Sequence, residues 1–267
     1  FKKKFEVIFQ SSFPHEIYSV NAFFGFLVQT IYRFCFPYCK KVIVVSNGAK
    51  SRVQEYSKDV AVEVIPLCTE FPLNRCQSKR SVILRFIYIG TFSRVRDLNV
   101  VVSSFFRLYT KGLTFSLSMA GGTKDDFITQ YPLLEAIVEE LVNEGYLSFL
   151  GKICRGKMPE VISSHDYGIN LIPPKPIFLE SSSTKLAEYL SQGVPVISSS
   201  GIAYHHYIHS LGSIGYLSEF NEASISLVLS NCIQKPIYAQ NYENQAKESM
   251  DVVSYNLRYK MYIDKIF

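Results

Sequence analysis

Two glutamates, Glu180 and Glu188, stand eight residues apart around the start of a predicted helix. Ser183 and Thr184 lie between them, and such residues begin helices and expose the first backbone N–H groups. A helix end of this kind attracts a pyrophosphate, and a carboxylate on either side can accept hydrogen bonds from sugar hydroxyls. The spacing alone could be chance, with Glu188 a surface acid. The Gly-Val-Pro-Val-Ile strand start at residues 193–197 makes chance a poor explanation.

A second candidate for phosphate binding is the loop over residues 90–97, which joins a predicted buried strand to a predicted helix. Its backbone N–H groups and the guanidinium groups of Arg94 and Arg96 lie where a helix N-terminus attracts phosphate. The plainer interpretation is an ordinary turn with two solvated arginines. The G-x-G-x-x-G fingerprint of dinucleotide-binding proteins is absent, which argues against an NAD enzyme.

Alternating strand and helix patterns predict the scaffold that carries these residues. The predicted strands cover residues 5–9, 41–45, 62–66, 82–89, 114–119, 147–150, 167–172 and 194–198. The predicted helices cover residues 20–38, 49–56, 98–109, 127–142, 158–163, 184–190, 219–232 and 242–266. The regular alternation after Ser81 implies right-handed parallel crossovers and a doubly wound, Rossmann-like sheet. Ligands of such α/β sheets bind at the carboxyl ends of the strands.

The pattern divides the chain into unequal parts. Residues 1–66 read as the remainder of an N-terminal Rossmann-like domain, and residues 67–80, which lack a hydrophobic period, as a linker. Residues 81–237 read as a complete C-terminal domain, and residues 238–267 as a helix that packs back toward the N-terminal domain. Only about three strands are predicted before Arg80, fewer than a Rossmann-like half needs. We therefore expect the chain by itself to have little activity.

Composition excludes several classes of protein. Hydrophobic residues make up 48% and charged residues 19% of the 267-residue chain, which argues against disorder. The longest apolar run, residues 22–28, is far shorter than the roughly 20 residues that a transmembrane helix requires. The six scattered cysteines are typical of reduced thiols in the cytosol.

Positive charge is concentrated near the front of the chain. Residues 1–80 hold 12 of the 28 Lys and Arg but only 6 of the 23 Asp and Glu. Together with the apolar helix over residues 20–38 and the cluster Lys2-Lys3-Lys4, this predicts peripheral contact with an anionic membrane. A solvated basic face is the alternative. The sequence resembles no nucleic-acid-binding module, so no nucleic-acid partner is expected.

Taken together, the motifs resemble glycosyltransferase family 4, the retaining enzymes of GT-B fold that use nucleotide sugars. The resemblance covers most of the chain and rests on segments in the family's order and spacing. These are Ile43–Ser46, Val64–Pro66, Tyr88–Gly90, Ala120–Gly122, Phe149–Gly151, His165–Tyr167, the pair Glu180 and Glu188, and Gly193–Ile197.

The resemblance implies roles for individual residues. Glu180, at the donor sugar, and Arg96, at the phosphates, would be catalytic, with Arg96 in the place of the family's usual Lys. Glu188 would bind the ribose hydroxyls, and main-chain groups of Gly151 and Lys152 the base. The donor-binding residues implied in this way are Glu188, Gly90, Thr91, Ser183, Thr184, Lys185, Gly151 and Lys152. Among them Thr91 is a departure, because the family usually has an Arg directly after the glycine.

The N-terminal part departs further from the family's pattern, because the first part of that domain, with its Gly-rich loop, has no counterpart here. Gln10, Ser11 and Ser12 stand where many members carry an active-site His, and His15 follows slightly late. His15 is therefore a candidate on the acceptor side.

These observations predict an enzyme that transfers a hexose-type sugar with retention from a nucleotide diphosphate sugar to a glycan or lipid-linked acceptor. We expect it in the cytoplasm or peripherally at the inner membrane face. No cofactor and no metal are expected, because Arg96 and the helix end neutralise the leaving diphosphate. One alternative is a sugar-nucleotide epimerase of GT-B fold, which would need several carboxylates and a His in the cleft. The other is a truncated or catalytically idle nucleotide-sugar-binding subunit.

Overall fold

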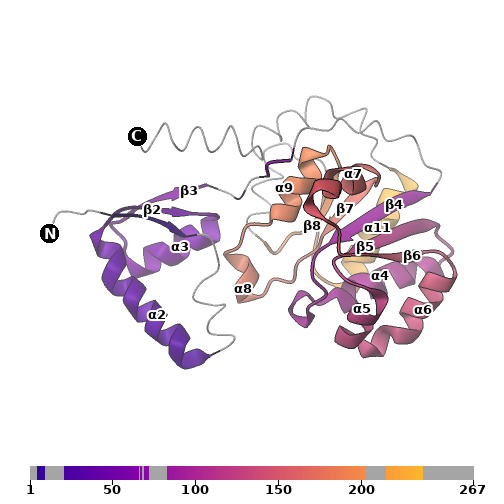
Figure 1. Cartoon of the computed structure of the whole chain (residues 1–267), viewed down its shortest axis with the longest axis horizontal. Helices are drawn as coiled ribbons and strands as arrows, with labels where there is room; N and C mark the ends of the chain where they lie inside the picture. The colour runs from indigo at the N-terminus through magenta and orange to yellow at the C-terminus, as the bar shows by residue number, and fades with distance from the viewer. Residues whose placement is uncertain are drawn as a thin grey trace.

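The computed structural model describes residues 21–65, 67, 69–71, 83–202 and 215–236, and the backbone of residues 5–9. Within these ranges the chain forms two α/β units, each built on a parallel sheet (Figure 1). The predictions that concern Lys2-Lys3-Lys4, His15, most of the linker and the helix over residues 242–266 lie outside the described residues.

Among the described residues, the N-terminal unit consists of a three-stranded parallel sheet and two α-helices. Its strands, in spatial order, are β1 (Phe5–Phe9), β2 (Cys39–Val44) and β3 (Ala61–Val64). Its helices are α2 (Ala22–Cys35) and α3 (Asn47–Tyr56), and a 3-10 turn over Phe36–Tyr38 follows α2. The apolar run of β2 is buried, as expected for a strand with a neighbour on each side.

Both helices begin at a capping side chain. The carboxamide oxygen of Asn21 accepts hydrogen bonds from the N–H groups of Phe23 and Phe24. The hydroxyl of Ser46 accepts one from the N–H of Ala49. The helix predicted over residues 20–38 therefore begins later than expected, and its last turn takes 3-10 geometry where a proline enters.

The C-terminal unit holds a six-stranded parallel sheet in the order β6-β5-β4-β7-β8-β9. Its strands are β4 (Leu84–Ile89), β5 (Phe115–Ala120), β6 (Leu147–Gly151), β7 (Tyr167–Asn170), β8 (Val196–Ser199) and β9 (Gly215–Ser218). Its α-helices are α4 (Leu98–Thr110), α5 (Lys124–Gln130), α6 (Glu135–Asn143), α7 (Met158–Ser163), α8 (Pro176–Leu179), α9 (Thr184–Ser191) and α11 (Glu222–Gln234). The chain winds from β4 out to β6 and then places β7 on the other side of β4, which is the predicted doubly wound topology.

The structure corrects several local predictions. The single helix predicted over residues 127–142 is two helices, because Tyr131 precedes a proline and leaves helical geometry (φ −130°, ψ 62°). The strand predicted over residues 167–172 ends at Asn170, and that predicted from Val194 begins at Val196. The short elements α8 and β9 have no counterpart among the predictions, since four residues show too little periodicity.

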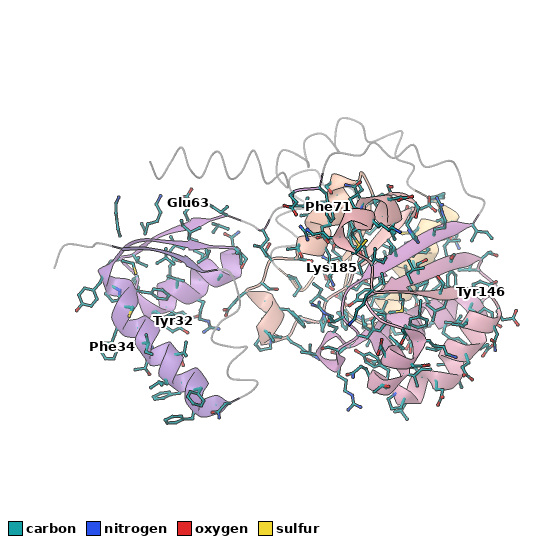
Figure 2. The ribbon with its side chains drawn as sticks, in the orientation of Figure 1. Tyr32, Phe34, Glu63, Phe71, Tyr146 and Lys185 are labelled. Carbon is teal, nitrogen blue, oxygen red and sulfur yellow. The ribbon has the colours of Figure 1, made fainter. Side chains whose placement is uncertain are left out.

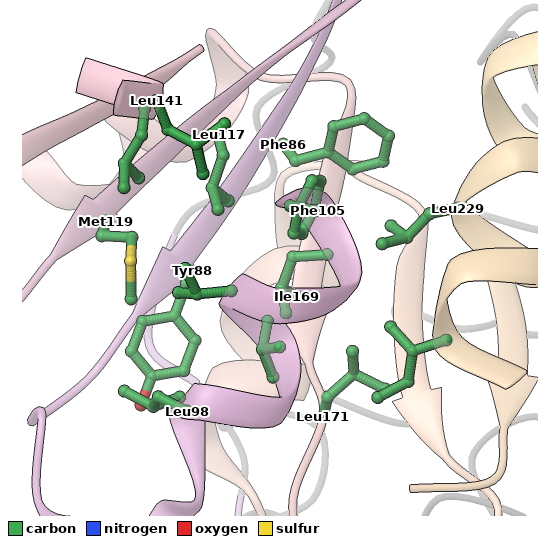
Figure 3. Close-up of a cluster of buried hydrophobic side chains, with 14 of the residues drawn as sticks. Phe86, Tyr88, Leu98, Phe105, Leu117, Met119, Leu141, Ile169, Leu171 and Leu229 are labelled. Atoms are coloured by element: carbon green, nitrogen blue, oxygen red, sulfur yellow. The ribbon is translucent and has the colours of Figure 1, made fainter. Parts of the chain in front are cut away.

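The sheet of the C-terminal unit is apolar on both faces. In β4, Phe86 and Tyr88 belong to the core beneath α4, while Ile87 and Ile89 belong to the core beneath α7 and α9. Figure 3 shows the first of these cores, where the rings of Phe86 and Phe105 lie 5.2 Å apart. Burial on both faces fixes the sheet rigidly, so the loops at its carboxyl edge have a firm base.

Candidate functional site

Three loops after neighbouring strands meet at the carboxyl edge of the large sheet. The N–H of Gly90, after β4, donates to the carbonyl of Ala120 at 2.9 Å, and the N–H of Gly121 donates to the carbonyl of Gly151 at 2.8 Å. A Cβ at Gly121 would lie 2.1 Å from the carbonyl oxygen of Gly90. Because the backbone of Gly90 already fills that place, only glycine fits at position 121, and the loops after β4 and β5 pack backbone against backbone.

Helix α9 points its N-terminus into the same region, and in the part of the chain that the structure describes no side chain caps it. Ser183 stands at the N-cap position, but its hydroxyl donates to the carboxamide oxygen of Asn170 at 2.8 Å instead of accepting from the helix. The hydrogen bond anchors the start of α9 to the end of β7. The first backbone N–H groups of the helix therefore keep their positive potential for an anion.

Two cations converge beside this helix start. The ammonium of Lys185 lies 4.9 Å from the centre of the Tyr88 ring, and a Cβ at Gly90 would be 3.0 Å from its Nζ (Figure 2). The guanidinium of Arg96 lies 5.5 Å from the centre of the Phe178 ring. Burial, and secondly the charge of Arg96, hold the pKa of Lys185 well below its usual value. An anion that binds here would be attracted by the charge of Arg96 and would favour the protonated form of Lys185, so the two basic side chains form a site that suits an anion.

The two arginines of the 90–97 loop differ in their contacts. Arg94 is exposed, and its Nε donates to the backbone carbonyl of Gln130 at 3.0 Å. Arg96 is partly buried and acts on the ammonium of Lys185. The structure thus brings Arg96, and not Arg94, to the candidate site.

Glu188 lies one turn into α9 and faces the loop after β6. Its side chain is 12% exposed, and its Oε1 lies 3.8 Å from Nη1 of Arg155. Burial raises the pKa of Glu188, while the charges of Arg155 and Lys185 oppose that rise. The carboxylate of Glu188 therefore lies near two basic side chains, Arg155 and Lys185, beside the glycine-lined strand edge. In this position it can accept hydrogen bonds from neutral hydroxyls.

Arg155 is itself held in place by contacts outside α9. Its guanidinium lies 5.1 Å from the centre of the Phe71 ring, and its Nε donates to Glu70 at 2.8 Å. Nothing in the sequence singles out this arginine, because it begins a short 3-10 turn, Arg155–Lys157, without a recognisable motif. Its proximity to Glu188 adds a positive group near that carboxylate.

Glu180 is buried at the junction of the two units. Its Oε1 accepts a hydrogen bond of 2.8 Å from Nε of Arg52, on α3, and its backbone carbonyl accepts one of 2.6 Å from the hydroxyl of Ser46. The two units also pack closely at Gly48, since a Cβ there would lie 2.5 Å from the carbonyl oxygen of Leu179. Neither Arg52 nor its pairing with Glu180 was predicted, because 128 residues separate the two.

Other predicted residues take different places. Thr91 and Thr184 are exposed, and the carbonyl of Thr91 accepts from the hydroxyl of Tyr88 at 3.1 Å. Lys152 is exposed. Hydrogen bonds with the backbone N–H and the side chain of Thr123 lower the pKa of Asp126, on α5, and the charge of Lys152 adds a smaller effect in the same direction. His165 is buried, and its two ring nitrogens make hydrogen bonds with the hydroxyl of Ser118 and the carbonyl of Val161. These contacts give it a role in packing the C-terminal unit.

No protein-family model matches this chain, and no curated protein does. Several solved structures do. Sucrose-phosphate synthase from Thermosynechococcus elongatus matches with a TM-score of 0.74 and 15% identity, over 97% of this chain and 66% of that one. HepE of Anabaena, in complex with UDP and glucose, matches with a TM-score of 0.71 and 13% identity, over 98% of this chain and 70% of that one.

A third match is trehalose-6-phosphate synthase, solved in a study of glycosyl transfer with retention. Its TM-score is 0.69 at 10% identity, over 97% of this chain and 67% of that one. This chain thus spans about two thirds of the length of these structures. At such identities the likeness establishes architecture, and the architecture of this chain is the GT-B fold of glycosyltransferases.

Proposed function

We propose that the chain carries the donor site of a retaining glycosyltransferase, similar to family 4, that uses a nucleotide diphosphate sugar. The observation that carries the proposal is the convergence of the α9 start, Lys185 and Arg96 on a glycine-lined strand edge, with Glu188 on the same helix. Glu180 lies in the loop before that helix. The cations and the helix start suit a diphosphate, and the carboxylates suit the hydroxyls of a ribose and a sugar.

In the proposed reaction the bond between the anomeric carbon and the diphosphate oxygen breaks. The acceptor hydroxyl oxygen forms the new bond to that carbon on the same face, and its proton passes to the departing diphosphate. Negative charge grows on the leaving oxygen as its bond breaks. Arg96, Lys185 and the start of α9 would stabilise that charge, in surroundings where water screens it little.

The choice of UDP as the first nucleotide to test follows from HepE, which was solved with UDP and glucose. Retention is supported by the resemblance to family 4 and by the match to trehalose-6-phosphate synthase, studied for glycosyl transfer with retention. The acceptor we propose is a glycan or a lipid-linked glycan, met on the cytoplasmic side, as the resemblance implies.

The proposal is tested with a panel of nucleotide sugars, UDP-glucose, UDP-galactose, UDP-N-acetylglucosamine and GDP-mannose. Binding is measured by calorimetry and turnover by nucleotide release. We expect at least one donor to bind, and the double substitution Arg96→Gln and Lys185→Gln to abolish its binding while Arg94→Gln retains it. Binding without release in the presence of glycan acceptors would favour the truncated or catalytically idle nucleotide-sugar-binding subunit. Failure of all donors to bind would overturn the proposal.

A further inference from the structure

We propose that Lys175 is a positioning residue of the donor site, which holds the turn that carries Arg96; this inference rests on the proposed function. The ammonium of Lys175 makes two contacts with that one short turn. Its Nζ donates to the backbone carbonyl of Val95 at 3.1 Å and to Oδ1 of Asp97 at 2.7 Å. The two acceptors belong to the residues directly before and directly after Arg96, so a single side chain holds both neighbours of the arginine.

The backbone at Asp97 requires support of this kind. Among the described residues, Asp97 is the one residue other than glycine with a positive φ, at 47°. A left-handed backbone costs free energy at a residue that carries a Cβ, and it persists only where the surrounding contacts hold it. Asp97 occupies the N-cap position of α4, but its side chain makes no capping hydrogen bond. Its carboxylate accepts from Lys175 instead, so this pair holds the unusual backbone in place.

The two ends of the segment that contains the turn are fixed separately, by Tyr131. The hydroxyl of Tyr131 donates to the carbonyl of Ser93 at 2.9 Å and accepts from the N–H of Leu98 at 3.1 Å. Lys175 therefore acts on the middle of a segment whose ends do not depend on it. We expect the loss of Lys175 to alter the turn locally and to leave the rest of the unit folded.

The segment that carries Lys175 also contacts the side chain of Arg96. Lys175 stands at the N-cap position of α8, and Phe178, the third residue of that helix, has its ring centre 5.5 Å from the guanidinium of Arg96. One short helix thus holds the turn at its start and supports the arginine two residues before its end. A half-exposed ion pair by itself stabilises a fold little, so the main effect of Lys175 should be on the direction of Arg96.

The inference is tested by measuring the UDP affinity of the whole chain by calorimetry, in wild type, Lys175→Gln, Arg96→Gln and the double variant. Lys175→Gln should weaken binding about fivefold in the wild-type background and by less than about twofold in the Arg96→Gln background, because Lys175 acts through Arg96. A residue that only stabilised the fold, or that contacted UDP itself, would have the same effect in both backgrounds. Lys124→Gln is the matched control, since Lys124 is a half-exposed lysine paired with Glu139, and it should change neither affinity.

A second pair of variants tests the backbone at Asp97. Asp97→Gly and Asp97→Ala both remove the carboxylate and differ by a single methyl group. Glycine adopts a positive φ without strain, whereas alanine does not, so the turn relaxes more in Asp97→Ala and must be formed again when UDP binds. Asp97→Gly should therefore bind UDP about fivefold more tightly than Asp97→Ala.

The outcomes distinguish this inference from the proposed function. Equal effects of Lys175→Gln in the two backgrounds would overturn the inference and leave the proposed function standing. Equal UDP affinities of Asp97→Gly and Asp97→Ala would do the same. A wild-type chain that binds neither UDP nor any donor of the panel would overturn the proposed function, and the inference with it. Urea titration of each variant checks that the C-terminal unit remains folded.

Discussion

Nε of Arg52, in the N-terminal unit, donates a hydrogen bond of 2.8 Å to Oε1 of Glu180, in the C-terminal unit. Glu180 is 5% exposed, so little water screens this ion pair. The hydrogen bond from Ser46 to the backbone carbonyl of Glu180 holds the same residue from the same side. The orientation of the carboxylate proposed to meet the donor sugar is therefore set by a residue from across the junction.

We expect Arg52→Gln to weaken UDP-glucose binding more than UDP binding, because only the sugar would contact Glu180. Loss of a charge-assisted hydrogen bond costs about 1.5 to 3 kcal/mol, and part of that loss should appear in the UDP-glucose affinity. Calorimetry with both ligands measures the difference. Glu55→Gln is the control, since it removes the exposed partner of Arg52 and leaves Glu180 paired. If Arg52→Gln lowers the affinities for UDP and UDP-glucose equally, Glu180 does not contact the sugar.

Glu188→Ala should weaken UDP binding by about 1.5 to 3 kcal/mol, because a carboxylate that accepts ribose hydroxyls is lost. Titration calorimetry with UDP gives the affinity. Glu139→Ala provides the comparison, since Glu139 is a helix glutamate in an exposed ion pair with Lys124 at 3.5 Å. If the two variants bind UDP equally well, Glu188 does not belong to the site.

In a complete enzyme that carries this chain, Arg96→Ala should lower kcat more than it raises KM, since the charge that Arg96 opposes grows as the glycosidic bond breaks. Steady-state nucleotide release, with the donor and acceptor identified in the panel, measures both constants. Arg94→Ala should change neither by much, because Arg94 is exposed and bonded to Gln130. Identical behaviour of the two variants would mean that the loop acts only as a general positive surface.

Much of the C-terminal unit could be predicted from sequence, because most of its parallel strands are apolar runs, and β4, β5 and β6 end at or directly before a glycine. Buried β4 is read directly from its run of apolar residues, and Gly90 marks its end. The candidate residues near one strand edge, such as Arg96 and Lys185, could be found because the edge of a doubly wound sheet collects them. Short elements without periodicity, such as β9, could not be found in this way.

The contacts between the units could not be predicted, because no local pattern connects their partners. Arg52 stands on a helix whose sequence shows only an ordinary i, i+3 pair with Glu55. Its second partner, Glu180, comes close only in the folded structure, where α3 packs against the loop after α8. Arg155 likewise contacts the aromatic ring of Phe71, which is distant in sequence, so this contact could not be predicted either.

Tyr189→Phe should destabilise the C-terminal unit, because Tyr189 ties α9 to β4. Its buried hydroxyl accepts from the N–H of Ile89 at 3.0 Å and donates to the carbonyl of Ile87 at 3.3 Å. Leaving buried backbone groups without this partner costs about 1 to 3 kcal/mol in the free energy of unfolding, which urea titration measures. Tyr146→Phe should cost less, since the Tyr146 hydroxyl makes no hydrogen bond with the described residues. Equal stability of wild type and Tyr189→Phe would contradict this role.

Lys185 should make nucleotide binding depend on pH. Its pKa is held well below the usual value by burial and by Arg96, while Glu188 acts in the opposite direction. A diphosphate beside Nζ favours the charged form and raises that pKa, so binding takes up a proton at any pH between the pKa of the free site and that of the complex. Affinity for UDP should fall as pH rises through this interval. Calorimetry in buffers of different ionisation heat counts the proton, and Lys185→Gln should abolish its uptake.

Folding stability without ligand should change with pH in the opposite direction. In the unfolded chain Lys185 keeps its proton up to its ordinary pKa of about 10.4, so the unfolded state binds more protons than the folded state once pH exceeds the lowered pKa. The free energy of unfolding should therefore gain a contribution that increases with pH over that range, and Lys185→Gln should remove it. Urea titrations across the interval measure this slope. Two results together would contradict this picture: equal slopes for wild type and Lys185→Gln, and binding heats that do not depend on the buffer. They would show that Lys185 stays protonated, so that its charge is always available to the diphosphate.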